Sequence, residues 1–66
     1  MDTTQTPNFR VIRLPTVLAK TGVSRATIYR LVERGDFPQP RRLSERTSVW
    51  DEAEVDGWLK ARLGVA

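Results

Sequence analysis

The chain has 66 residues, no cysteine, no histidine and a formal net charge of +3. So short a chain forms one domain with a small core, and it lacks disulfides, thiolate metal sites and the side chain that most often acts as a general base or metal ligand. An enzyme is therefore not expected, and neither is a metal, a cofactor or a small-molecule ligand.

Positive charge is concentrated in the first 50 residues. Residues 1–50 carry nine Lys or Arg against four Asp or Glu, a balance of +5, whereas residues 51–66 carry two against four, a balance of −2. Local positive potential is what a protein needs to bind nucleic-acid phosphates, because binding releases their counterions. The segregation favours a polyanionic partner, and an ordinary solubilising mixture of charges is the alternative.

The N-terminal segment is expected to lie outside the folded domain. Residues 1–8 (MDTTQTPN) are polar and show no periodicity, which predicts a disordered leader before a single domain at 9–66. No apolar run reaches membrane-spanning length, and the N-terminus does not resemble a signal peptide. The expected location is the cytoplasm, without a membrane partner.

A short strand and two short helices are predicted next. The run FRVIRL at 9–14 alternates apolar and basic residues as a strand does, and it is suited to pair with a later hairpin. Pro15 suits the first turn of a helix that ends before Gly22. Ser24 is a good N-cap for a second helix from Arg25 to Arg34, which the prolines beyond it prevent from continuing. The two helices should meet across a tight turn.

A two-stranded ribbon with a basic tip is predicted after the prolines. The runs RRLS (41–44) and TSVW (47–50) are compatible with strands and are joined by two residues that include Arg46. If Leu43 points into the core, Arg42 points outward by strand alternation. The ribbon could contact a groove of DNA or its phosphates, and an ordinary solvated hairpin is the alternative.

The last predicted helix has a clear start and end. Asp51, with Glu54 three residues later, has the spacing of a capping box, and an apolar face then continues to Gly64. Trp50 and Trp58 are interpreted as the two large anchors of the core rather than as platforms for stacking on bases.

The second helix separates an apolar face from a polar one. On a helical wheel, one group lies within about 40° of the buried direction: Ser24, Ile28, Leu31 and Val32. Another group lies between about 100° and about 200° from that direction: Ala26, Tyr29, Arg30 and Glu33. A recognition helix requires this division, because its inner face docks on the preceding helix while its outer face reaches base edges.

Three outward residues of this helix have the chemistry for reading a groove. Arg25 and Arg30 can offer paired N–H groups to guanine or clamp phosphates. The small Ala26 lets the backbone approach closely, and its methyl group can touch the methyl group of thymine. The alternative for each arginine is a solvated surface position without a ligand.

Hydroxyl groups and the ribbon supply the remaining predicted contacts. Ser24 and Thr27 can bond phosphate near the positive end of the helix dipole, although capping could occupy Ser24 fully. Tyr29 can offer its hydroxyl to a phosphate or pack its ring against the ribbon. Arg42 and Arg46 are the predicted contacts from the ribbon.

Three pieces of the sequence, in this order and spacing, resemble a known family: SRATIYRL, GDFPQP and SVWDEAEVDGWL. The stretch 13–63 that contains them is similar to the AlpA family of small phage and prophage regulators, relatives of the excisionases and of the DNA-binding part of MerR-type regulators. The resemblance implies a mainly helical winged helix-turn-helix with a small β-hairpin wing. It also places the second helix in the major groove and the wing on flanking backbone or in the minor groove. Ser44 departs from the pattern, since a glycine is usual in the wing.

These observations together predict a sequence-specific regulator that binds double-stranded DNA of a phage or other mobile element, associated with the nucleoid of a bacterial host, and acts on transcription or excision. One alternative is an excisionase, a recombination directionality factor that bends attachment-site DNA and directs an integrase. Another is a protein-binding adaptor whose basic face meets an acidic partner, with residues 60–66 mediating assembly. By resemblance to excisionases, self-association along DNA is expected.

Overall fold

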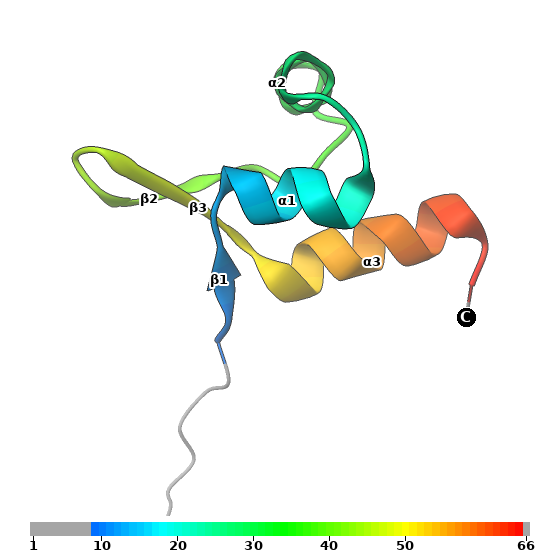
Figure 1. Cartoon of the computed structure of the whole chain (residues 1–66). Helices are drawn as coiled ribbons and strands as arrows, with labels where there is room; N and C mark the ends of the chain where they lie inside the picture. The colour runs from blue at the N-terminus through cyan, green and yellow to red at the C-terminus, as the bar shows by residue number, and fades with distance from the viewer. Residues whose placement is uncertain (1–8, 66) are drawn as a thin grey trace, which may run out of the picture.

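The computed structural model describes residues 9–65, and the leader predicted at 1–8 lies outside the described residues. The described part forms three helices and a small sheet (Figure 1). In chain order its elements are β1 (Val11–Ile12), α1 (Leu14–Thr21), α2 (Arg25–Glu33), β2 (Arg41–Ser44), β3 (Thr47–Asp51) and α3 (Glu52–Leu63). The predicted mainly helical fold with a β-hairpin is confirmed, and it is compatible with a winged helix-turn-helix.

A tight left-handed turn separates α1 from α2. Gly22 follows α1 with φ of 74°, a conformation that residues with a Cβ rarely adopt, and its N–H donates to the carbonyl oxygen of Leu18 at 2.7 Å. Pro15 lies in the first turn of α1, as predicted. In Figure 1, α2 is seen end-on above α1, which runs across the view, so the two helices cross.

The C-terminal end of α2 is closed by backbone hydrogen bonds. Arg34 is the C-cap of α2 rather than its last helical residue. Beyond it, Gly35 has φ of 76°. The N–H of Gly35 donates to the carbonyl oxygen of Val32 at 3.0 Å, and the N–H of Asp36 donates to the carbonyl oxygen of Leu31 at 2.8 Å. These two bonds are the pair of a Schellman motif, which satisfies the last carbonyl groups of a helix.

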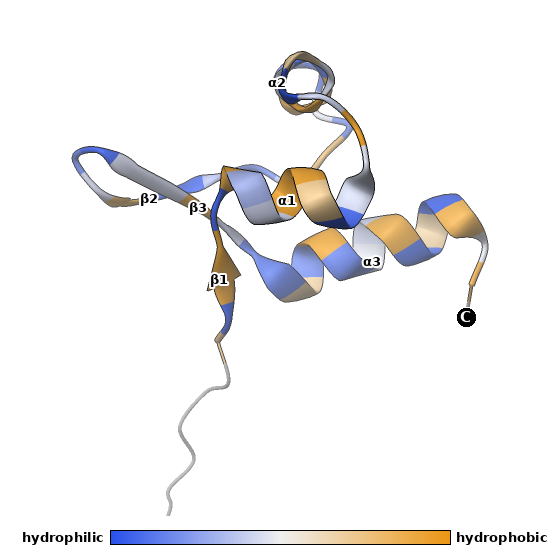
Figure 2. Cartoon of the chain, viewed as in Figure 1, coloured by the Kyte–Doolittle hydropathy of each residue, from blue (hydrophilic) through white to orange (hydrophobic). Residues whose placement is uncertain are grey.

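The core draws on every element except β2. Its buried side chains are Ile12, Val17, Ile28, Phe37, Trp50 and Val55. Trp50 is the largest of them, is 1% exposed, and donates its indole N–H to the carbonyl oxygen of Pro38 at 2.9 Å. Figure 2 shows hydrophobic residues in β1 and in the middle of α1, and hydrophilic residues at the tip of the β2–β3 hairpin. The hairpin therefore extends beyond the part of the molecule that the core stabilises.

Trp58 connects α3 to the segment that follows α2. Its indole N–H donates to the carbonyl oxygen of Asp36 at 2.6 Å, and its ring meets Phe37 edge-on with 4.8 Å between the ring centroids. The guanidinium of Arg62 lies over the Trp58 ring, 4.6 Å from its centroid. Trp58 is half-buried and packs at the margin of the core. Both tryptophans are thus structural anchors, as predicted.

The sheet has β3 at its centre, with β1 and β2 antiparallel on either side. Val11 pairs with Asp51, and Ile12 pairs with Trp50. The backbone N–H of Glu52 also donates to the carbonyl oxygen of Arg10, the residue before β1, at 2.9 Å. The predicted pairing of the first strand with the hairpin is therefore confirmed.

The condition from which the outward orientation of Arg42 was predicted, a Leu43 side chain in the core, is not met, because that side chain is 66% exposed. Arg42 pairs with Ser48, but the next pair is Ser44 with Thr47, so the register shifts at Leu43. Such a bulge breaks the alternation on which the prediction rested. Arg42 is nevertheless exposed, as predicted.

The start of α3 only partly follows the predicted capping box. The carboxylate of Asp51 accepts a hydrogen bond from the N–H of Ala53 at 3.0 Å, which confirms Asp51 as the N-cap. Glu54, however, pairs with Arg41 of β2, with 3.0 Å between Nη2 and Oε2. A tertiary ion pair thus takes the carboxylate that the local pattern assigned to the cap.

Lys20 joins α1 to α3 through two carboxylates. Its Nζ lies 2.9 Å from Oδ1 of Asp56 and 3.0 Å from Oε2 of Glu52. Hydrogen bonds to Asp56 and then to Glu52 raise the pKa of Lys20 above its ordinary value of 10.5. Because the folded pKa is raised, this contribution to stability is fully present below pH 10.5 and is lost as the pH rises through the folded value.

We therefore predict that Lys20→Met lowers the melting temperature near neutral pH, and that the difference from the wild type shrinks above pH 10.5. Thermal unfolding followed by circular dichroism between neutral and strongly alkaline pH measures this difference. Lys60→Met is the control. It changes an exposed lysine of α3 and should leave the melting temperature unchanged. A Lys20→Met difference that stays constant across the whole pH range would contradict the assignment.

Candidate nucleic-acid interface

The N-terminus of α2 is capped by a pair of hydroxyl groups. Ser24 Oγ accepts a hydrogen bond from the N–H of Thr27 at 3.2 Å and donates to Thr27 Oγ1 at 3.0 Å. The predicted capping role of Ser24 is therefore confirmed. Its place on the buried side of the helical wheel was wrong: Ser24 is exposed, because an N-cap has an extended backbone and does not follow helical geometry.

The inner face of α2 is held firmly by the core. Ile28 is fully buried, and Leu31 and Val32 are half-buried against the same cluster. On the outer face, Arg25, Ala26 and Arg30 are exposed, Thr27 is half-buried and Tyr29 is 45% exposed. The sequence-based division of the helix into two faces is thus correct for the residues inside the helix.

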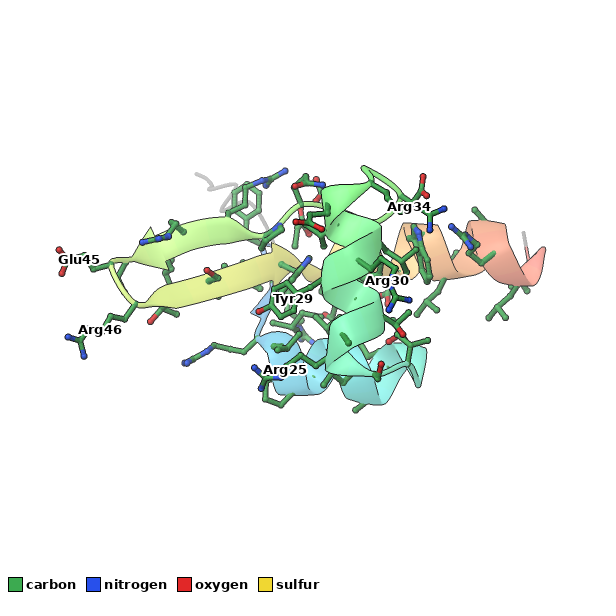
Figure 3. All side chains as sticks on the ribbon, turned by 90° about the horizontal axis from the view of Figure 1, so that it is seen from above. Arg25, Tyr29, Arg30, Arg34, Glu45 and Arg46 are labelled. Carbon is green, nitrogen blue, oxygen red and sulfur yellow. The ribbon has the colours of Figure 1, made fainter. Side chains whose placement is uncertain are left out.

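The outer side chains of α2 form two rows. In Figure 3, which views α2 from outside the molecule, Arg25 and Tyr29 lie on the side of the hairpin. Arg30 and Arg34 lie on the opposite side, toward α3. Two cationic flanks separated by the exposed methyl group of Ala26 suit a groove whose two edges are lined by phosphates.

The β2–β3 hairpin forms a separate projection. Glu45 and Arg46 lie at its far end, well away from α2 (Figure 3). Arg42 Nη1 donates to the carbonyl oxygen of Glu45 at 2.8 Å, so the guanidinium braces the turn. No residue of the described part other than glycine has a positive φ, so the turn is not the type I′ or II′ usual for two-residue hairpins. The adjacent bulge accommodates a turn without the usual glycine.

Acidic side chains neutralise only some of the cations. Within residues 9–65 the ion pairs are Arg10 and Lys20 with Glu52, Lys20 with Asp56, Arg34 with Asp36, and Arg41 with Glu54. In the same range no ion pair holds Arg25, Arg30 or Arg46. Their charge is therefore available to an external anion, whereas that of Arg34 is partly satisfied internally.

Arg13 was missed as a candidate contact by the sequence analysis. It is the exposed N-cap residue of α1 and follows directly after the pair of Ile12 with Trp50, and no ion pair among the described residues involves it. Its charge is therefore available to an external anion. Only the three-dimensional pairing of the acidic residues distinguishes it from Arg10, which Glu52 neutralises.

Comparison with known proteins identifies the family. Residues 10–63 match the family described as "Prophage CP4-57 regulatory protein (AlpA)". The chain belongs to the AlpA family. The matched range runs from just before β1 to the last residue of α3, and so includes both α2 and the hairpin. The resemblance found in the sequence is confirmed.

Two relatives of this AlpA-family chain show how far the likeness extends. The "DNA-binding transcriptional activator AlpA" of Escherichia coli (strain K12) is 46% identical, over 80% of this chain and 84% of the relative. The "Uncharacterized protein ORF88" of Enterobacteria phage P4 is 37% identical over 82% of this chain, and the alignment covers 61% of that protein. Both come from the setting of phages and their hosts that the resemblance implied.

Two other kinds of feature are not found in the described part of this AlpA-family chain. Between residues 9 and 65 no three acidic side chains lie close enough together to hold a metal ion. None of the helices in that range is long and apolar enough to span a bilayer. The candidate interface is the exposed surface of α2 and the hairpin, where Arg25, Arg30 and Arg46 form no ion pair within residues 9–65.

Proposed function

We propose that this chain is a sequence-specific double-stranded DNA-binding regulator of a phage or other mobile element. The observation that carries the proposal is the outer face of α2, where Arg25 and Arg30 form no ion pair within residues 9–65 while the inner face of the helix is buried. The name of the Escherichia coli relative as a DNA-binding transcriptional activator supports it. In this proposal α2 enters the major groove, which is wide enough to admit a helix.

Each residue of α2 then has a defined task. Arg30 and Arg25 bond the N7 and O6 acceptors of guanine or clamp the adjacent phosphates. Ala26 allows close approach to the groove. Because Thr27 Oγ1 accepts the proton of Ser24, the Thr27 hydroxyl keeps its own proton to donate to a phosphate at the start of α2.

The cations of the hairpin and the hydroxyl of Tyr29 bind backbone phosphates rather than base edges. Arg46, at the tip, has the reach to contact phosphates beyond the groove that α2 occupies. Arg42 keeps the guanidinium N–H groups that do not brace the turn, and these can also meet a phosphate. Tyr29, which lies on the hairpin side of α2, offers its hydroxyl to the same strand.

Salt dependence and a wing substitution test the proposal. If about four phosphates are neutralised, the logarithm of the binding constant should fall with the logarithm of salt concentration with a slope of about −3.6. We predict that Arg46→Ala weakens binding to all duplexes alike and makes the slope shallower by about 0.9. Fluorescence anisotropy of labelled duplexes across a salt series measures both quantities.

Lys60→Ala is the matched control, since it removes an exposed cation on α3 that is not part of the proposed interface. It should leave the affinity and the slope unchanged. A wild-type protein that binds no duplex at low salt would reject the proposal and favour an adaptor that meets an acidic protein partner.

Selection of bound duplexes from a random pool identifies the target and separates two modes of action. A recovered sequence that matches a promoter supports control of transcription. An excisionase requires instead that the protein change the direction or yield of recombination when added to an integrase and attachment-site DNA. No change in that reaction would reject the excisionase alternative.

A further inference from the structure

The hairpin carries a large apolar side chain among cations. Leu43 is 66% exposed, follows Arg41 and Arg42 directly, and precedes Arg46 at the tip. Single exposed leucines are common on protein surfaces. This one differs in position, because it lies on the part of the molecule that projects beyond the core and next to charges that attract DNA.

A bulge and a side-chain hydrogen bond fix the backbone around Leu43. The register shift between Arg42 and Ser44 makes it the extra residue of a bulge, so it has no partner across the hairpin. The hydrogen bond from Arg42 Nη1 to the carbonyl oxygen of Glu45, at 2.8 Å, closes the turn directly beyond it. Bulges commonly re-aim a side chain next to functional sites.

This combination fits the minor groove of DNA. Proteins that bind that groove use arginine for its negative potential and often insert an apolar side chain between two base pairs, which partly unstacks them. We infer that Leu43 is such an apolar wedge, entering the minor groove beside the α2 site while Arg46 holds the flanking phosphates. The inference rests on the proposed function, and it adds a means of specificity, since flexible pyrimidine–purine steps are the easiest to unstack.

A duplex containing the selected sequence, with 2-aminopurine placed in turn at each step flanking the α2 site, tests this inference. The wild-type protein should raise 2-aminopurine fluorescence at one flanking step. Leu43→Ser should abolish that rise and weaken binding about 5- to 10-fold, because the apolar contact is lost. Leu43→Met, which retains an apolar side chain of similar volume, should restore both signals.

Leu63→Ser is the matched control, because Leu63 is 73% exposed but lies at the end of α3. It should bind and unstack DNA as the wild type does. Wild-type affinity and fluorescence in Leu43→Ser, or binding by the wild type without unstacking at any flanking step, would overturn the wedge while leaving DNA binding intact. A wild type that binds no duplex would overturn the proposed function itself.

Discussion

Trp50→Ala is expected to leave the chain without a cooperative unfolding transition. Trp50 is 1% exposed in a core of only a few side chains, and its indole N–H satisfies the carbonyl oxygen of Pro38. Truncation of a buried aromatic residue to alanine costs about 3 to 5 kcal/mol. A domain of this size seldom has more than about 3 to 5 kcal/mol of stability in reserve, so the loss should consume it.

Thermal unfolding followed by far- and near-ultraviolet circular dichroism measures this effect. Trp50→Phe is the informative control, because it keeps most of the apolar volume and removes the hydrogen bond to Pro38. It should unfold cooperatively at a lower temperature than the wild type. A cooperative transition in Trp50→Ala near the wild-type temperature would show that the core does not depend on this side chain.

Arg30→Ala is expected to reduce discrimination between the selected sequence and bulk DNA. If the guanidinium reads a base, its loss costs about 1 to 3 kcal/mol at the specific site and much less at other sequences. Competition of labelled specific duplex against unlabelled bulk duplex measures the ratio of the two affinities. Equal losses on both kinds of DNA would show that Arg30 binds phosphate and reads no base.

Arg34→Ala provides a control within the same helix. Arg34 and Arg30 lie on the same side of α2 (Figure 3), one turn apart, but Arg34 is paired with Asp36 at 3.2 Å. Its charge is already partly satisfied, so its removal should change the specificity ratio little. Comparison of the specificity ratios of the two variants shows whether Arg30 contacts a base or whether the loss of any one positive charge has the same effect.

The sequence predicted the features that depend on neighbouring residues. The caps at Ser24 and Asp51, the turn at Gly22 and the buried stripe through Ile28 are encoded within one or two helical turns, and all are present in the structure. For the same reason α2 could be identified as the candidate interface before any tertiary contact was known.

The features that failed depend on distant parts of the chain. The orientation of Arg42 was predicted on the condition that Leu43 points into the core, but a bulge interrupts the strand and Leu43 is exposed. Glu54 was assigned to a cap, but Arg41, 13 residues earlier, pairs with it. Arg13 could be recognised as a candidate contact only once the acidic side chains had been matched with the cations that they pair with. No periodicity in the sequence reports such pairings.

The attachment of Trp58 to the carbonyl oxygen of Asp36 has a consequence for how the protein can change its target. That bond, like the two that close α2 at Gly35 and Asp36, is accepted by a main-chain oxygen and does not involve the outer side chains of α2. The anchoring of α2 and the chemistry of its outer face are thus encoded by separate sets of atoms. If α2 reads DNA as proposed, we expect substitutions at Arg25, Ala26 and Arg30 to change the sequence that is bound without weakening the packing of α2.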